Sequence, residues 1–230
     1  MSYSQKCISY FNDQYSEEAP YWSEQANLLV PLVGSYIPPN SRVLVLGCGE
    51  GRDALFLARL GFDVVGTDLA VSGLKKAQKQ AENLNVNLEL LELDVHDSHS
   101  HLGEFDVILT MSLLQFLNPE LIADRIDHFK SLVKPGGFFS VETFTVDDPL
   151  YLRALESGRG EIAPLTIAHP EREYGIRFFE KGELRSYFED WGFYFYHEGP
   201  IWDRPHGLQN EFHKHGVAQM IAQKSVLKKE

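Results

Sequence analysis

Three alternate glycines directly after a short apolar run are the residues most suited to chemistry in this chain. The loop consists of Gly47, Cys48, Gly49, Glu50 and Gly51. Glycine has no Cβ, so its backbone can approach a ligand closely and adopt φ values that other residues avoid. A second apolar run ends on Asp68, whose carboxylate can accept hydrogen bonds from ribose hydroxyls. The loop and the acid together predict a nucleotide-type binding site.

The spacing G-x-G-x-G differs from two common phosphate-binding loops. The dinucleotide fingerprint requires a third glycine where this chain has Arg52. A P-loop continues into Lys-Ser or Lys-Thr, and neither pair follows here. The loop therefore favours a ligand that needs close backbone approach but has no phosphate. S-adenosylmethionine is a ligand of this kind.

The segments that must position the loop alternate between strand and helix patterns. We expect strands at 43–46, 63–67, 88–95, 104–110, 193–197 and 212–224. We expect helices at 4–15, 23–35, 52–60, 72–84, 119–133 and 181–191. Such alternation predicts a mostly parallel sheet with the ligand at its C-terminal edge.

Residues 43–68 resemble the cofactor half of class I S-adenosylmethionine-dependent methyltransferases. Residues 88–95, 104–110 and 132–139 are similar to the third strand, the fourth strand and the turn into the fifth. The resemblance covers roughly residues 40–145. It implies an α/β fold: a Rossmann-like, doubly wound, seven-stranded, mostly parallel sheet with an antiparallel C-terminal strand.

The resemblance also implies which residues bind S-adenosyl-L-methionine. Asp68 would bond the ribose, Asp94 would contact the adenine region, and residues after the fourth strand would form a wall of the pocket. The expected cofactor-binding residues are Gly47, Cys48, Gly49, Gly51, Asp68, Leu69, Asp94, Val95, Thr110 and Met111. The family often has an acid where this chain has Val45. Support for the methionine end is therefore reduced or comes from elsewhere.

Segments outside this core resemble a narrower group, the tellurite-resistance and thiopurine type of small-molecule methyltransferase. The segments are Ala19–Trp22, Gly51–Ala54 and Phe179–Trp191. The Asn/Asp-Pro-Pro-aromatic motif of base and glutamine methyltransferases does not follow the fourth strand. This resemblance implies a small-molecule acceptor such as a thiol or a chalcogen oxyanion.

The length of 230 residues, 43% of them hydrophobic, suits one methyltransferase domain over residues 1–230. We divide it into an N-terminal helical cap (1–40), a cofactor-binding half (41–145) and a substrate-side half (146–230). Three prolines and three glycines within 147–176 favour a surface excursion there, and this segment is a candidate lid.

The acceptor side offers cationic side chains in the C-terminal third. We expect Arg204 and His206, near His213 and His215, to hold an anionic acceptor as a polar clamp. The alternative is that these are ordinary surface histidines. A thiolate, selenite or tellurite acceptor would need no general base, because the sulfonium already activates the leaving group. Aligning the reactants and excluding water would then be the main tasks of the protein.

Aromatic residues near the N-terminus have two open interpretations. Tyr15, Tyr21 and Trp22 could cover the cofactor as a lid or pack a helix onto the core.

Charge and cysteine content limit the partners. The net charge of −12 disfavours nucleic acids and anionic membranes, which bind basic surfaces. Two cysteines in unrelated contexts imply no disulfide framework, and no apolar run has the length of a signal sequence or membrane span. These features predict a cytoplasmic location.

No metal site is predicted from the sequence. His96, His99 and His101 have neither cysteine partners nor helical spacing.

Two other functions remain open at this point. One is a nicotinamide-dependent oxidoreductase, against which Arg52 and Asp94 argue. The other is a cofactor-binding module without turnover, for which Val45 is a hint.

Overall fold

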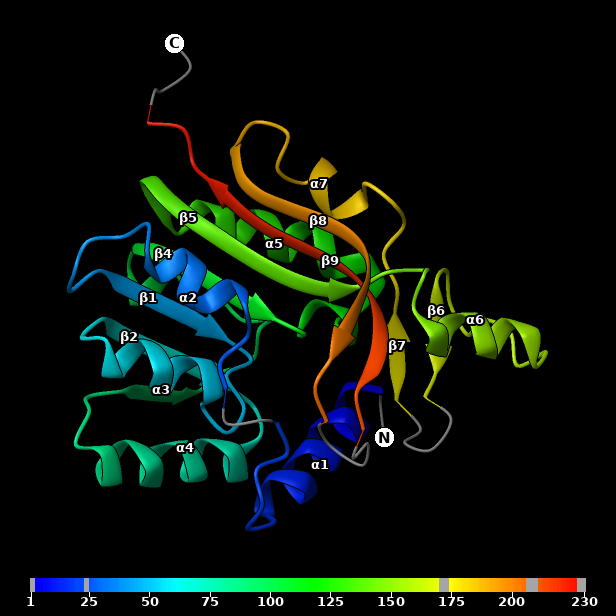
Figure 1. Ribbon diagram of the computed structural model, residues 1–230, viewed down its shortest axis with the longest axis horizontal. Helices are drawn as coiled ribbons and strands as arrows, with labels where there is room; N and C mark the ends of the chain where they lie inside the picture. The colour runs from blue at the N-terminus through cyan, green and yellow to red at the C-terminus, as the bar shows by residue number, and fades with distance from the viewer. Residues whose placement is uncertain (1–2, 23–24, 170–173, 206–210, 227–230) are drawn as a thin grey trace.

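The structure, a computed structural model, describes residues 3–22, 25–169, 174–205 and 211–226. The strands of its main sheet are β1 (Arg42–Leu46), β2 (Asp63–Asp68), β3 (Glu89–Glu92), β4 (Phe105–Met111), β5 (Val133–Phe144), β8 (Gly192–Asp203) and β9 (His213–Gln223). Within the described residues these seven pair in the order β3-β2-β1-β4-β5-β9-β8 (Figure 1). Strand β9 runs antiparallel to both β5 and β8, and the other pairs among them are parallel. The predicted Rossmann-like α/β sheet with an antiparallel C-terminal strand is confirmed.

Helices cover both faces of the sheet (Figure 1). They are α1 (Tyr3–Ser16), α2 (Leu29–Gly34), α3 (Arg52–Arg59), α4 (Val71–Leu84), α5 (Ile122–Ser131), α6 (Pro149–Glu156) and α7 (Glu183–Ser186), with 3-10 turns at Ser100–Leu102, Leu114–Phe116 and Pro119–Leu121. Among the described residues, no helix combines the length and the apolar character needed to cross a membrane.

The sheet separates two hydrophobic cores because alternate side chains of a strand point to opposite faces. Leu44 and Leu46 of β1 join the core that α5 and α7 cover. Val43 and Val45 join the core that α2, α3 and α4 cover. All four side chains are buried. This two-sided burial explains the continuous apolar run before the glycine loop.

The C-terminal edge of the parallel strands is the edge on which α1 lies (Figure 1). Helix α1 contacts α4, and Ser72 near the start of α4 donates hydrogen bonds to Asn12 of α1 from its backbone N (3.0 Å) and its Oγ (3.0 Å). The N-terminal helix is therefore fixed over the strand ends where the sequence predicts a ligand.

The described residues of the segment 147–176, namely 147–169 and 174–176, form a small substructure beside the sheet. It contains α6 and the antiparallel pair β6 (Thr166–Ala168) and β7 (Gly175–Arg177). Its buried side chains include Tyr151, Ile167 and Tyr174. These side chains pack together and against Tyr10 of α1 and Phe144 of β5. The role of the segment as a lid stays a prediction.

Of the predicted helix at 23–35, residues 23 and 24 lie outside the described residues. The prediction is wrong for 25–28, because α2 begins only at Leu29. The side chain of Asn27 accepts a hydrogen bond from Leu29 N at 3.0 Å, and Asn27 N donates to Asp53 Oδ1 at 2.8 Å. These contacts hold the preceding chain against α3 and leave Asn27 outside the helix.

The predicted helix at 181–191 is also too long, since α7 ends at Ser186. Lys130 Nζ donates to the carbonyl of Tyr187 at 2.5 Å, and Phe188 and Trp191 are buried beneath the turns that follow. Tertiary packing therefore ends the helix early.

Two strands differ in length from the prediction. The strand predicted at 193–197 extends over Gly192–Asp203, whereas the one at 88–95 is limited to Glu89–Glu92. The long β8 exists because it pairs with β9 along its whole length, up to the pair Asp203 and His213.

Candidate cofactor and acceptor site

A pocket opens at the carboxyl ends of β1, β2 and β4, beside α1. Of the residues predicted to bind the cofactor, those lining it are Gly47, Cys48, Asp68, Leu69, Asp94, Val95 and Met111. Gly49, Gly51 and Thr110 are not among the described lining residues. Thr110 is fully buried within β4, one residue before the lining Met111.

The glycine loop is held by close contacts that a side chain would prevent. Gly47, Gly49 and Gly51 have φ values of 62°, 53° and 86°, in the left-handed region that favours glycine. A Cβ at Gly49 would lie 2.7 Å from Tyr15 Oη, and one at Gly51 would lie 2.7 Å from Ala77 Cβ. The glycines therefore let α1 and α4 pack directly on the loop.

Asp68 connects the loop to the end of β2. Its Oδ2 accepts from Gly49 N at 2.7 Å, and its Oδ1 accepts from Ala70 N at 2.8 Å. Burial raises the pKa of Asp68, while the backbone N–H groups of Ala70 and Gly49 oppose that rise. A carboxylate has about four acceptor positions, so it can also accept from a ligand hydroxyl in the pocket.

Asp94 lies two residues beyond β3 and is paired locally. Its Oδ1 lies 2.9 Å from His96 N and 2.8 Å from His96 Nδ1. Its side chain is 37% exposed. Asp94 and His96 both line the pocket. They follow β3, which β2 separates from β1 and its glycine loop in the sheet.

An ion pair that the sequence analysis missed also lines the pocket. Arg52 Nε and Nη2 donate to the two oxygens of Asp53 at 3.0 and 2.7 Å. Burial alone would lower the pKa of Arg52, but carboxylates, Asp53 foremost, raise it above its usual value. The guanidinium is thus a permanent charge in the pocket. The sequence signal for this ion pair is the Arg-Asp dipeptide directly after the glycine loop, within the motif Gly51–Ala54.

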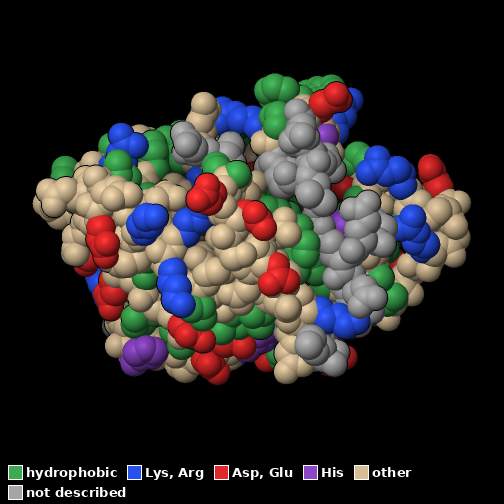
Figure 2. Space-filling model, turned by 90° about the horizontal axis from the view of Figure 1, so that it is seen from below, with side chains coloured by type: hydrophobic (Ala, Val, Ile, Leu, Met, Phe, Trp, Pro, Cys, Tyr) green, Lys and Arg blue, Asp and Glu red, His purple; other side chains and the backbone are tan. Residues whose placement is uncertain are grey.

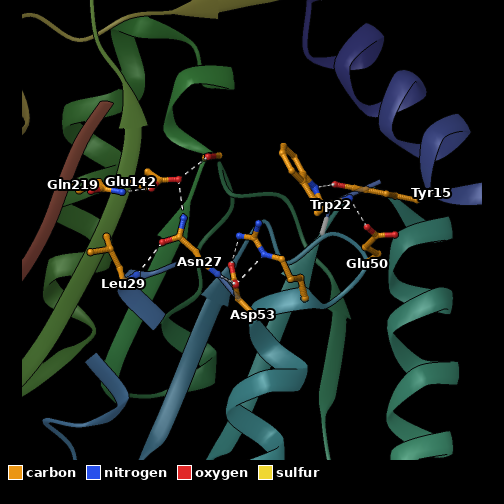
Figure 3. Close-up of polar contacts among 10 residues, drawn as sticks. Tyr15, Trp22, Asn27, Leu29, Glu50, Asp53, Glu142 and Gln219 are labelled. Atoms are coloured by element: carbon orange, nitrogen blue, oxygen red, sulfur yellow. Dashed lines mark hydrogen bonds and ion pairs between the residues drawn. The ribbon is translucent and has the colours of Figure 1, made fainter. Parts of the chain in front are cut away.

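A polar network fixes this ion pair to the sheet (Figure 3). Asn27 donates its backbone N to Asp53 and its Nδ2 to Glu142 Oε1, the latter at 2.8 Å. Gln219 Nε2 donates to the other oxygen of Glu142 at 2.5 Å. Strands β5 and β9 therefore support Asp53 through Asn27. The expectation that support for the methionine end comes from residues other than Val45 has candidates in this network and stays a prediction.

A second network holds the N-terminal aromatic residues (Figure 3). Trp22 N donates to Glu50 Oε1 at 2.8 Å, and Trp22 Nε1 donates to Tyr15 Oη at 3.0 Å. Lys76 pairs with Glu50 at 2.8 Å. Tyr15 and Trp22 line the pocket, whereas Tyr21 packs into the aromatic cluster behind them. Packing on the core is therefore shown for Tyr21, and the role of Tyr15 and Trp22 as a lid over the cofactor stays a prediction.

The predicted acceptor residues stand after the end of β8 in the sequence. Arg204 follows β8, is half-buried, and donates its backbone N to Asp203 Oδ1 at 2.7 Å. It is not among the described residues lining the pocket, and His206 lies outside the described residues. Asp203 contributes to the raised pKa of Arg52, so the end of β8 lies within electrostatic range of the pocket.

The three histidines after β3 lie in different surroundings. His96 contacts Asp94, His99 is fully buried against Phe129, and His101 is exposed. Among the described residues they do not form a metal-binding group.

Known proteins resemble this chain in sequence. Residues 43–137 match the family described as "Methyltransferase domain". The probable S-adenosyl-L-methionine-dependent methyltransferase TehB of Haemophilus influenzae is 28% identical over 68% of this chain and 48% of its own length. The ubiquinone biosynthesis O-methyltransferase of Acinetobacter baylyi is 30% identical over 72% of this chain and 76% of its own length. The chain spans about half the length of the TehB proteins it matches, 48% and 59%.

The fold has a solved counterpart as well. The crystal structure of TehB from Haemophilus influenzae superposes with a TM-score of 0.69 and 25% identity, covering 95% of this chain and 67% of that one. The glycine loop, the acid after β2 and the strand order agree with these similarities. The chain belongs to the class I S-adenosyl-L-methionine-dependent methyltransferases, and within them it resembles the TehB type.

Proposed function

We propose that this protein transfers a methyl group from S-adenosyl-L-methionine to a small, anionic acceptor. The observation that supports this most is the pairing of Arg52–Asp53 with Asp68 in one pocket. The opposite charges of Arg52 and Asp53 suit the carboxylate and ammonium groups of an amino acid. The carboxylate of Asp68 at the end of β2 suits a ribose.

Different residues of the pocket would contact different parts of the cofactor. Arg52 would bind the carboxylate of the methionine part, and Asp53 its ammonium group, each through charge-assisted hydrogen bonds. Gly47 and Cys48 would lie against the methionine chain, and Asp68 would accept from the ribose. The remaining pocket-lining residues of the predicted set would contact the adenosine part: Leu69, Asp94, Val95 and Met111.

When bound, S-adenosyl-L-methionine supplies a methyl group that its sulfonium already activates. The protein therefore has to align the acceptor with that methyl group and exclude water. Tyr15 and Trp22 cover one side of the pocket and would exclude water there. The thiols of Cys7 and Cys48 are poor nucleophiles, because burial and then the charge of Asp68 raise the pKa of each.

The acceptor would enter from the substrate-side half, 146–230, where Arg204 and His206 would hold it. A thiol or chalcogen oxyanion suits such a clamp, since its anionic form needs no general base. The names of the relatives, a TehB protein and a ubiquinone biosynthesis O-methyltransferase, are consistent with a small-molecule acceptor. Segment 147–176 would act as a lid over it.

Macromolecular partners are disfavoured by charge. The net charge is −12, and acidic and basic side chains are interspersed on the face that Figure 2 shows. Nucleic acids and anionic membranes bind continuous basic surfaces instead. We place the protein in the cytoplasm, since Cys7 and Cys48 are free thiols and a reducing compartment keeps thiols free.

A methyl-donor consumption screen tests the proposal. The protein is incubated with S-adenosyl-L-methionine and separate panels of thiols, chalcogen oxyanions and small amines, and release of S-adenosylhomocysteine is measured. We expect turnover with a thiol or an oxyanion. Cofactor binding without turnover in any panel would instead indicate a binding module, and turnover restricted to amines would contradict the anionic acceptor.

A further inference from the structure

Three metal-ligand side chains meet where β8 ends and β9 begins. Asp203 is the cross-strand partner of His213, and His215 follows two residues later on the same face of β9. One ligand atom from each lies within 4.8 Å of the others. From this arrangement we propose that Asp203, His213 and His215 bind a divalent transition-metal ion of the zinc type.

The hydrogen bonds of the two imidazoles determine which nitrogens face each other. His213 Nδ1 lies 3.0 Å from the carbonyl oxygen of Glu211, and His215 Nδ1 lies 2.8 Å from Asp148 Oδ2. A carbonyl and a carboxylate only accept, so each Nδ1 carries the proton of its ring. In the neutral rings both Nε2 atoms therefore present lone pairs.

Those two Nε2 atoms are 3.0 Å apart. Two lone pairs at this distance repel, and a positive charge between them would stabilise the arrangement. The charge can be an additional proton on one ring or a metal ion bound by both. The carboxylate of Asp203 on the adjacent strand favours the metal ion, because it adds a third ligand to the same point.

The site has the supporting contacts that metal-bound histidines need. Histidine ligands in proteins usually donate the other ring nitrogen to a carboxylate or carbonyl, which fixes the ring. Asp148 does this for His215, and its Oδ2 also accepts from Gly216 N at 3.1 Å. Its side chain is 2% exposed. The ring of His215 stacks on Phe144 with centroids 4.7 Å apart.

The ligand set indicates the class of ion. Two imidazoles with one carboxylate suit Zn²⁺ and its borderline neighbours rather than Mg²⁺ or Ca²⁺, which prefer oxygen ligands. Zinc bonds of about 2.0–2.2 Å require ligand atoms about 3.3 Å apart in a tetrahedron. Small side-chain movements from the present separations would meet that distance. Three protein ligands leave the fourth position to water or another ligand.

Metal titration of the purified, tag-free chain tests the site. Co²⁺ replaces Zn²⁺ in such sites and reports tetrahedral coordination by its visible absorption. We expect one Co²⁺ per chain with a strong visible band, displaced by Zn²⁺, and a melting temperature raised by either ion.

Variants connect that signal to the proposed ligands. His213→Ala removes a ligand from a partly exposed strand end and should abolish the band, and Asp148→Asn should weaken binding about 10–100-fold. His101→Ala, at an exposed histidine elsewhere, is the matched control and should bind as the unaltered chain does. Circular dichroism of each variant verifies folding.

Two results would overturn the proposal. One is the absence of stoichiometric binding of either ion to the unaltered chain, which would assign the positive charge to a proton. The other is equal affinity in folded His213→Ala and His101→Ala. Binding of S-adenosyl-L-methionine is measured separately and does not bear on either result.

Discussion

The cofactor side and the acceptor side of this molecule are built in different ways. On the cofactor side, the left-handed φ values of a loop of adjacent residues shape the backbone, and the end of the next strand holds it, with Gly49 N donating to Asp68 at 2.7 Å. On the acceptor side, the start of β9 contacts Asp148 of the 147–176 substructure, whose buried side chains cluster with residues of α1 and β5. Local backbone geometry therefore specifies the first site, and long-range pairing assembles the second.

The largest effect should come from Gly49→Val, which attacks the local geometry directly. The new side chain would need a left-handed φ of 53° and would meet Tyr15 Oη at 2.7 Å. We expect loss of S-adenosyl-L-methionine binding by calorimetry. Gly61→Val is the matched control, since Gly61 has a φ of 85° and open space around it. If both variants lost cofactor binding equally, backbone strain and not the contact with Tyr15 would explain the loss.

Removing the pocket cation should have the next largest effect. Arg52→Ala leaves the methionine carboxylate without its partner, and we expect binding weaker by about 1.5–3 kcal/mol, the range for hydrogen bonds to charged groups. Arg59→Ala, at the exposed end of the same helix, should change nothing. Unchanged cofactor affinity in Arg52→Ala would indicate that the methionine part binds in another part of the pocket.

The ribose contact should contribute a similar or smaller amount. Asp68→Ala should weaken cofactor binding by about 1–3 kcal/mol, because a carboxylate hydrogen bond in a partly buried site is lost. Thermal melting is needed beside calorimetry, since Asp68 also caps Gly49 and Ala70. Full affinity in a folded Asp68→Ala variant would be incompatible with its role.

Variants on the acceptor side should separate turnover from cofactor binding. Arg204→Ala and His206→Ala should each lower methyl transfer to the acceptor found in the screen, while S-adenosyl-L-methionine affinity stays nearly constant. If both retain full activity, or if both lose cofactor binding, the acceptor lies elsewhere.

The smallest effect concerns the thiols beside the pocket. Burial, then Asp68, raises the pKa of Cys7 to about 12. Its thiolate is therefore scarce at pH 8, and iodoacetamide should react at least about tenfold more slowly than with the unfolded chain. The stabilisation from the raised pKa is complete below pH 9 and is lost as pH rises towards 12. Fast alkylation of the folded chain would contradict the burial of this side chain.

The sequence predicted the parts of the site that a backbone rule controls. Left-handed loop positions require glycine, and Asp68 stands where a strand ends, so both could be located by spacing. The pairing of Arg52 with Asp53 could not, because its position depends on Asn27 and Glu142 from distant segments. The early end of α7 depends likewise on Lys130, which lies in α5.

Isothermal titration of the unaltered chain with S-adenosyl-L-methionine, S-adenosylhomocysteine and NAD tests the central claim most directly. We predict that the first two bind one per chain in the same pocket, each competing with the other. We predict no saturable heat with NAD, since Arg52 stands where the dinucleotide fingerprint has the third glycine that lets a pyrophosphate approach. Binding of NAD, or of none of the three, would contradict the assignment of this pocket.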